Sequence, residues 1–294
     1  MPAPPQIFDR KAVRLHRDRA APHIDRVADV LRDCAERLLD RLDDTTRRFT
    51  QALDVGGRGV VAPMLRARGI DTVSCDLSPA MAGLDRSGFA VAADEEMLPF
   101  AAGSFDLVVA SLSLHWVNDL PGALIQLRMA LRPDGLLLAS LPTLGTLAEF
   151  RAALAAAEAA VSGGASPRVS PFPELRDCAA LLQRAGLALP VADMDEIRLL
   201  YADPGELARD LRAAGESNAI ASRDKRPPAA NLFPMALAGL PAEDGGRYPI
   251  TLRLAMMTGW APSPSQPKPM KPGSAEHSLA DALGGEPLGK PPRV

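Results

Sequence analysis

The sequence is poor in aromatic residues and in cysteine. Only 4% of its 294 residues are Phe, Trp or Tyr, although 47% are hydrophobic, so the core must be built mainly from Ala, Leu and Val. The three cysteines, Cys34, Cys75 and Cys178, are far apart and odd in number, which fits neither a disulfide framework nor a zinc site. We therefore expect a globular protein of a reducing compartment.

The chain also lacks an excess of positive charge and a long apolar run. Its formal net charge of −3 argues against a general nucleic-acid-binding protein, since such proteins neutralise phosphates with clustered Lys and Arg. No apolar stretch reaches the about 20 residues that a membrane helix needs, and the chain does not start with an apolar signal segment. We expect a cytoplasmic protein that acts on small molecules or proteins, with peripheral membrane contact left open. The Arg-rich segment 9–26 fits either a solvated helix face or an arm that binds a partner.

Strand-like and helix-like segments alternate from about residue 52 to residue 141, the pattern of a parallel sheet with helices on both faces. The predicted strands are 51–55, 72–76, 89–93, 105–111, 135–141, 190–202 and 248–260; the predicted helices are about 60–68, 78–86, 119–131, 146–161, 174–186 and 203–215. In the last helix, Asp203 is the expected N-cap and Pro204 the first helical residue. The sequence thus predicts a doubly wound, seven-stranded, mostly parallel α/β fold of the Rossmann-like class.

Composition outside this alternating pattern gives the expected domain organisation. Residues 1–50 form an N-terminal helical arm, and 51–260 form the cofactor-binding domain. The remainder, 261–294, is a tail whose Pro, Gly and Ser content predicts disorder. The segment from about 145 to 175 is the candidate substrate lid, because its glycines and prolines allow motion.

The stretch QALDVGGRGVVAP, residues 51–63, predicts a strand, a glycine-rich turn and a helix. In a doubly wound sheet, nucleotide-like ligands bind at such a turn. Gly57 and Gly59 fit the dinucleotide fingerprint with Asp76 as the ribose acid, which makes NAD one candidate. However, the carboxylate of Asp54 would repel a pyrophosphate held by the following amides. S-adenosyl-L-methionine carries an ammonium and a sulfonium and no phosphate, so it is the better match.

Carboxylates after the next two strands also fit this cofactor. Asp76 is placed to accept hydrogen bonds from both ribose hydroxyls. Asp94 or Glu95 is placed to accept from the adenine amine, with apolar side chains covering the ring. The candidate cofactor-binding residues are Asp54, Gly56, Gly57, Gly59, Asp76, Leu77, Asp94, Glu95, Met97 and Ser111. Structural alternatives stay open: a tight turn for the glycines, a charge at a helix N-terminus for Asp76, and an N-cap for Asp94.

Pro63 limits where the helix after the turn can begin. Since proline has no amide proton, it is tolerated only in the first turn of a helix. We therefore predict that this helix begins at Val60 or later.

The segment SLSLHWVND, residues 111–119, follows the fourth strand beside the expected methyl group. Methyl transfer mainly needs a positioned nucleophile, so no dedicated base is required. The candidate catalytic residues are Ser113, His115 and Trp116. His115 is either a base or a histidine bonded within its own loop, and Trp116 is either a wall or core residue or a stacking group. We expect no metal site, because His16 and His23 would lie about 10 Å apart along a helix.

Six segments together resemble one known family. They are IFDRKAVRLHRDRAA, ADEEMLPF, FDLVVASLSLHWVNDLPGAL, SPRVSPFPELRD, GESNA and MTGW. Over about residues 6–285 the chain resembles mitochondrial NADH:ubiquinone oxidoreductase complex I assembly factor 5 and its bacterial relatives, within the class I S-adenosylmethionine-dependent methyltransferase superfamily. This resemblance implies a methyltransferase-like fold, S-adenosyl-L-methionine as cofactor, and a protein substrate in complex I assembly, with hydroxylation of an arginine in an iron–sulfur subunit.

The glycine loop departs from the superfamily pattern D-x-G-x-G-x-G. Gly56 and Gly57 are adjacent, so one loop residue is missing. Two other functions therefore stay open. The chain also resembles the biotin-pathway enzyme of the superfamily, which predicts a small-molecule or malonyl-acyl-carrier-protein O-methyltransferase. The shortened loop is the reason to consider a non-catalytic assembly chaperone with a weakened cofactor site.

Overall fold

The computed structural model describes residues 6–164 and 166–266. The chain up to Pro262 forms one compact unit, and a second unit begins at Ser263. Most of the tail for which the sequence predicts disorder, from residue 267 onward, lies outside the described residues. Among the described residues, no helix is both long and apolar enough to cross a membrane.

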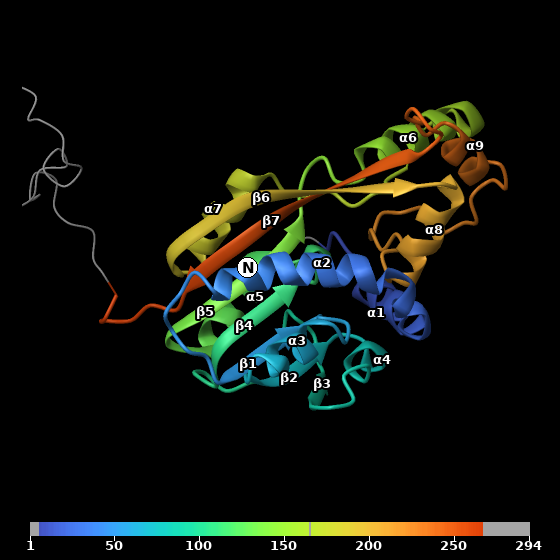
Figure 1. Ribbon diagram of the computed structural model, residues 1–294. Helices are drawn as coiled ribbons and strands as arrows, with labels where there is room; N and C mark the ends of the chain where they lie inside the picture. Colours follow the sequence, from blue (N-terminus) through green and yellow to red (C-terminus); the bar gives the residue numbers. More distant parts are fainter. Residues whose placement is uncertain (1–5, 165, 267–294) are drawn as a thin grey trace, which may run out of the picture. The chain divides into compact units, whose positions relative to one another are not determined.

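A seven-stranded sheet is the centre of the first unit (Figure 1). Its strands are β1 (Gln51–Val55), β2 (Asp71–Asp76), β3 (Phe89–Ala92), β4 (Phe105–Ser111), β5 (Leu131–Pro142), β6 (Ala188–Tyr201) and β7 (Tyr248–Trp260). They lie in the order β3-β2-β1-β4-β5-β7-β6. The first five strands are parallel, and β7 runs antiparallel between β5 and β6. The predicted seven-stranded, mostly parallel α/β fold is confirmed.

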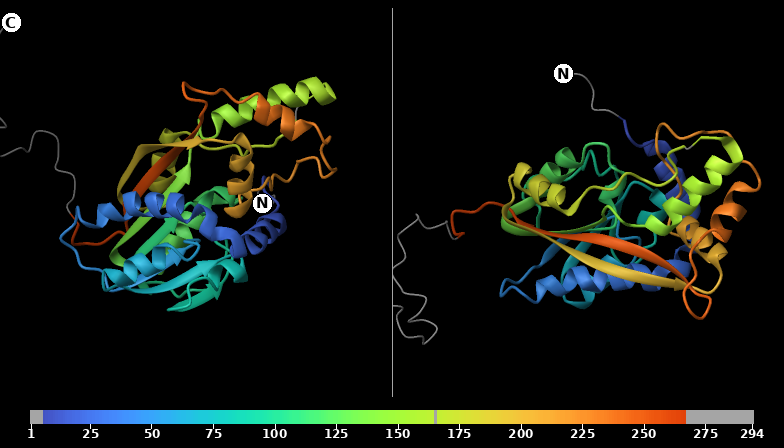
Figure 2. Two further views of the ribbon diagram at one scale, coloured as in Figure 1. Left: turned by 45° about the vertical axis from the view of Figure 1, so that its right-hand side comes forward. Right: turned by 90° about the horizontal axis from the view of Figure 1, so that it is seen from above.

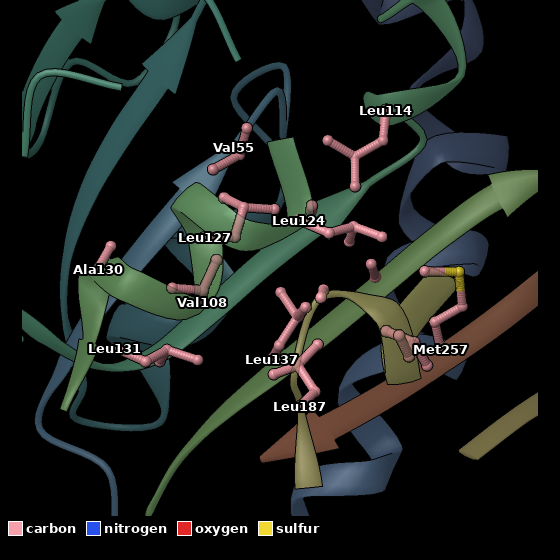
Figure 3. Close-up of a cluster of buried hydrophobic side chains, with 14 of the residues drawn as sticks. Val55, Val108, Leu114, Leu124, Leu127, Ala130, Leu131, Leu137, Leu187 and Met257 are labelled. Carbon is pink, nitrogen blue, oxygen red and sulfur yellow. The ribbon is translucent and has the colours of Figure 1, made fainter. Parts of the chain in front are cut away.

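Helices cover both faces of the sheet (Figures 1 and 2). α5 (Leu120–Ala130) and α7 (Leu175–Arg184) pack on one face, and α2 (Ala28–Leu39) and α3 (Val61–Ala67) pack on the other. Because successive strand side chains point to opposite faces, both faces of β4 are apolar and every residue of this strand is buried. Figure 3 shows the first layer, where Leu124 and Leu127 of α5 meet Val55, Val108 and Leu137 of the sheet.

Strands β6 and β7 extend past the parallel strands and carry a second group of helices (Figure 1). These are α6 (Ala148–Ser162), α8 (Pro204–Ala213) and α9 (Leu232–Ala238). They enclose an apolar cluster that includes Leu154, Leu207 and Ile250. At the start of α8, the Asp203 side chain accepts a hydrogen bond from the Gly205 amide at 2.9 Å, which confirms the predicted cap. The sequence analysis did not predict α9.

The N-terminal segment is part of the compact unit. It comprises α1 (Arg10–Ala20) and the 3-10 helix η1 (Ala21–Val27); two further 3-10 turns are η2 (Asp40–Leu42) and η3 (Leu114–Trp116). α1 packs on α8 and on the short helix α4 (Pro79–Ala82), with Val13, Arg17 and Ala20 buried. The expectation of a solvated face is therefore wrong for this side of α1, because one of its arginines finds carboxylate partners inside the protein.

Candidate functional site

The turn after β1 is tightly closed by its two adjacent glycines. A Cβ atom on Gly57 would lie 2.1 Å from Oδ1 of Asp54, and one on Gly56 would lie 2.3 Å from Cβ of Ser113. Gly56 also has φ +70°, a left-handed conformation that favours glycine. Both positions therefore require glycine.

The helix after the turn starts where Pro63 allows. α3 begins at Val61 with Val60 as its N-cap, so Pro63 lies in the first helical turn. This confirms the predicted start. Between the turn and the helix, the two consecutive residues Arg58 and Gly59 are left-handed, with φ +51° and +76°.

Asp54 is a buried acid at the end of β1. Its Oδ2 accepts a hydrogen bond from the Ala62 amide at 3.1 Å, whereas its Oδ1 has no partner. Burial raises the pKa of Asp54 to about 8, and the nearby charge of Asp76 acts in the same direction. Such an acid gains its negative charge most readily when a cation lies beside it.

Asp76 ends β2 and has two partners on one oxygen. Its Oδ1 accepts from the Ser78 amide at 2.8 Å and from Nη1 of Arg17 at 3.2 Å, whereas Oδ2 has no partner. Burial raises the pKa of this carboxyl despite the positive charge of Arg17. Asp76 thus bonds to the start of α4 and keeps one acceptor oxygen unused.

Two arginines of α1 neutralise the carboxylates of the site. Arg17 is 1% exposed; its Nη1 also donates to Glu95 at 2.7 Å, and its Nη2 donates to the Ser113 carbonyl at 3.3 Å. Arg10 pairs with Asp94 at 2.5 Å and with Glu95. Burial alone would raise the pKa of Glu95, but the charges of Arg17 and Arg10 hold it below its usual value. α1 therefore covers the acids that follow β2 and β3.

The other predicted cofactor residues lie around this group. Leu77 packs against the apolar cluster of Phe8 and Trp116, and Ser111 is buried at the end of β4. Met97 is 78% exposed, so its side chain lies at the rim and covers nothing in this structure.

Glu216 joins the loop after β4 to the glycine turn. Its Oε2 accepts from Nε1 of Trp116 at 2.7 Å and pairs with Nε2 of His115 at 2.8 Å. Its Oε1 accepts from Nη2 of Arg58 at 2.5 Å. Burial alone would raise the pKa of Glu216, but His115 and Arg58 hold it well below its usual value. His115 is thus bonded to a distant residue and not within its own loop, while Trp116 also stacks edge-on against Phe8 at 5.2 Å.

A cavity of about 390 Å³ opens beside these residues. Arg58, His115, Trp116 and Glu216 line one end of it. Most of the remaining wall is apolar and comes from η1, α2, α6, β6, β7, α8 and α9, for example Val27, Leu31, Phe150, Leu199, Leu207 and Phe233. Part of the predicted lid, from Thr146 to Phe172, contributes to this wall. Motion of that segment stays a prediction.

Four site residues were missed by the sequence analysis: Arg10, Arg17, Arg58 and Glu216. The sequence held a signal for Arg10 and Arg17, because they are seven residues apart and therefore lie on the same side of a helix. For Glu216 the signal was its place in GESNA, directly after a helix and a glycine.

The polar atoms of this region fit a polar ligand such as S-adenosyl-L-methionine. Buried side-chain atoms without a partner are rare in proteins. In the described part of the chain there are ten, and six gather here: Arg17 Nε, Asp54 Oδ1, Arg58 Nε, Asp76 Oδ2, Ser113 Oγ and His115 Nδ1. Free acceptors at the ends of β1 and β2 suit an ammonium and ribose hydroxyls. Across residues 6–164 and 166–266, no group of three His, Cys, Asp or Glu side chains is arranged to hold a metal ion.

The fold and the site define a protein of the methyltransferase class. Residues 53–139 match the family model described as "Methyltransferase domain". Among solved structures, the YcgJ protein of Bacillus subtilis has a TM-score of 0.53 at 13% identity, with 77% of this chain and 98% of that chain covered. A putative methyltransferase of Haloferax volcanii, solved in complex with the Trm112 activator, has a TM-score of 0.53 at 18% identity, covering 87% and 100%. At these identities the likeness shows the fold alone.

Curated relatives give the family. The chain is 37% identical over 289 residues to "Arginine-hydroxylase NDUFAF5, mitochondrial" of Danio rerio, covering 94% of this chain and 89% of that protein. The human protein of the same name is also 37% identical, covering 94% and 83%. A "Malonyl-[acyl-carrier protein] O-methyltransferase" of Laribacter hongkongensis is 34% identical over 276 residues, covering 87% and 90%. The chain belongs to the NDUFAF5 family of methyltransferase-fold enzymes.

Proposed function

We propose that this protein binds S-adenosyl-L-methionine and acts on an arginine side chain of a protein during complex I assembly. The observation that carries the proposal is the similarity to the arginine hydroxylase NDUFAF5, which extends over 94% of the chain and is not confined to the methyltransferase domain. The proposed substrate is an iron–sulfur subunit of complex I, and the proposed location is the cytoplasm.

Three groups of residues support the cofactor part of this proposal. Asp54 with the turn glycines would hold the methionine portion, because its free Oδ1 suits an ammonium. Asp76 would accept from the ribose through its free Oδ2. Asp94 would accept from the adenine amine after releasing Arg10. When bound, the cofactor supplies an electrophilic methyl group; the protein residues bind and orient it.

The malonyl-acyl-carrier-protein O-methyltransferases are the second candidate, because relatives of that name match 87% of this chain. The two functions differ in their substrate. A malonyl group is an anion and an arginine side chain is a cation, and the wall of the cavity carries both signs, with Glu216 and Asp210 beside Arg58, Arg168 and Arg212. Charge therefore does not separate the two substrates, and the higher identity and coverage of the NDUFAF5 relatives are the reason to propose the arginine first.

Deleting the gene separates these functions. If the protein acts in complex I assembly, the deletion strain loses NADH:quinone activity, and mass spectrometry of complex I shows an arginine peptide lighter by one oxygen atom. A mass loss of one methylene group would assign methylation instead. Normal complex I together with a requirement for biotin would contradict the proposal.

Calorimetric titration tests the cofactor separately. The purified protein should bind S-adenosyl-L-methionine and not NAD, and an Asp54→Ala, Asp76→Ala variant should lose this binding. If wild type binds neither and the variant still restores complex I in the deletion strain, the protein is an assembly chaperone.

A further inference from the structure

Glu216 lies where the site opens into the cavity. It follows α8 after a turn in which Gly215 has φ +79°, and its side chain is 19% exposed. The wall of the cavity contains one other carboxylate, that of Asp210, and Arg26 already binds this group at 2.5 Å. Glu216 is thus the acidic group next to the loop after β4.

The carboxylate of Glu216 is oriented by two fixed donors. Trp116 and His115 both bond to Oε2, at 2.7 and 2.8 Å, so the direction of Oε1 is set. One guanidinium nitrogen of Arg58, Nη2, donates both to Oε1 of Glu216 and to the carbonyl oxygen of Leu112. The second of these hydrogen bonds is 3.1 Å long. A carboxylate and a carbonyl that share one guanidinium nitrogen form a recognition site for that group.

We propose that Glu216 and the Leu112 carbonyl receive the guanidinium group of the substrate arginine, and that Arg58 holds this place until the substrate replaces it. The inference rests on the proposed function, in which the substrate is an arginine side chain. It adds that Glu216 selects the arginine side chain and that Arg58 occupies the same position when no substrate is bound.

The exchange of one guanidinium for another conserves charge. Glu216 keeps the same number of charge-assisted hydrogen bonds, whereas a neutral ligand in that place would leave the buried carboxylate without a positive partner at Oε1, which weakens binding by about tenfold or more. Arg58 lies between two glycines, Gly57 and Gly59, so no neighbouring side chain in the loop restricts its displacement. The apolar wall formed by side chains such as Leu31 and Leu207 suits the aliphatic stem of an arginine.

Binding of small probes tests the proposal without cofactor or turnover. The protein has two tryptophans, so a Trp260→Phe background leaves Trp116, which bonds to Glu216, as the only fluorescent indole. The probes are N-acetyl-arginine methylamide and its citrulline counterpart, which has the same shape and no charge. In this background the arginine probe should bind at least about tenfold more tightly than the citrulline probe.

Three variants divide the roles. Glu216→Gln keeps an acceptor for Trp116 and should abolish the preference for arginine. Arg58→Met removes the competitor and should tighten binding of the arginine probe. Arg212→Met is the matched control: the side chain of Arg212 lines the same cavity and makes no hydrogen bond or ion pair within the described residues, so its loss should have little effect.

Several results would overturn the proposal. Equal affinity for both probes, no binding of the arginine probe up to its solubility limit, or an unchanged preference in Glu216→Gln would each do so. If Glu216→Gln weakens both probes equally, Glu216 only orients Trp116 and His115. If Arg58→Met weakens the arginine probe, Arg58 is part of the receptor and not a competitor. Because complex I is measured separately in the deletion strain, the proposed function would survive any of these results.

Discussion

Replacing Arg17 by methionine should destabilise the protein strongly, and more at pH 8 than at pH 5. The guanidinium of Arg17 is 1% exposed and donates to Asp76 and Glu95, which are 2% and 0% exposed. Methionine keeps the length and the apolar stem and removes the charge. Loss of one partner from a buried ion pair costs about 3–5 kcal/mol, because the remaining charge is left uncompensated.

The pH dependence follows from Glu95. Its pKa is lowered in the folded protein, since Arg17 and Arg10 outweigh the effect of burial. A lowered pKa stabilises the fold above the unfolded value of about 4.3, and this contribution is lost as the pH falls through the folded value. Without Arg17, burial dominates and the folded pKa rises, so the variant becomes less stable as the pH increases above about 4. The gap between wild type and variant therefore widens toward pH 8.

Urea unfolding followed by circular dichroism at both pH values checks this prediction. Arg14→Met on the same helix is the control, because Arg14 is 56% exposed and its nearest carboxylate, Asp18, is 3.7 Å away. The control should change the free energy of unfolding by less than about 0.5 kcal/mol. A cost for Arg17→Met below about 1 kcal/mol at pH 8, or the same cost at both pH values, would refute the reasoning.

Two further predictions concern the turn after β1. Since the pKa of Asp54 is raised to about 8, the folded protein keeps a proton that the unfolded chain loses above about pH 3.9, and stability falls between those values. Asp54→Asn should remove this loss. The urea midpoint of the variant, measured relative to that of wild type, should therefore increase as the pH rises from 4 to 8; a difference between the two midpoints that does not change with pH would contradict this. Gly57→Ala should cost about 1–3 kcal/mol, because its Cβ would meet Asp54. Gly164→Ala, with nothing within 4 Å, should leave the melting temperature unchanged; equal shifts for both would argue against the clash.

The strands and the glycine turn could be predicted because their causes are local. β4 contains an uninterrupted apolar run of four residues, 107–110, and Asp203 next to Pro204 marks the start of α8 in any context. α9 was missed because its seven residues are too few to show a helical period in the sequence.

The electrostatics of the site could not be predicted, since the partners are distant in sequence. Arg17 bonds to residues 59 and 78 positions away, and Glu216 to residues 100, 101 and 158 positions away. A local pattern shows that an arginine lies on one side of a helix, but only the tertiary fold decides whether that side meets water or a buried acid.

The position of α1 also bears on the order in which the protein assembles during synthesis. α1 is synthesised before the segment that follows α8, yet Phe8 pairs with Ile220 and the amide of Asp9 donates to the carbonyl of Ala219 at 2.8 Å. Contacts between such distant parts of a chain form late, because a long loop must close first. α1 is therefore among the last of these helices to dock, and the acids of the site acquire their counter-charges only after the segment around Ile220 has emerged.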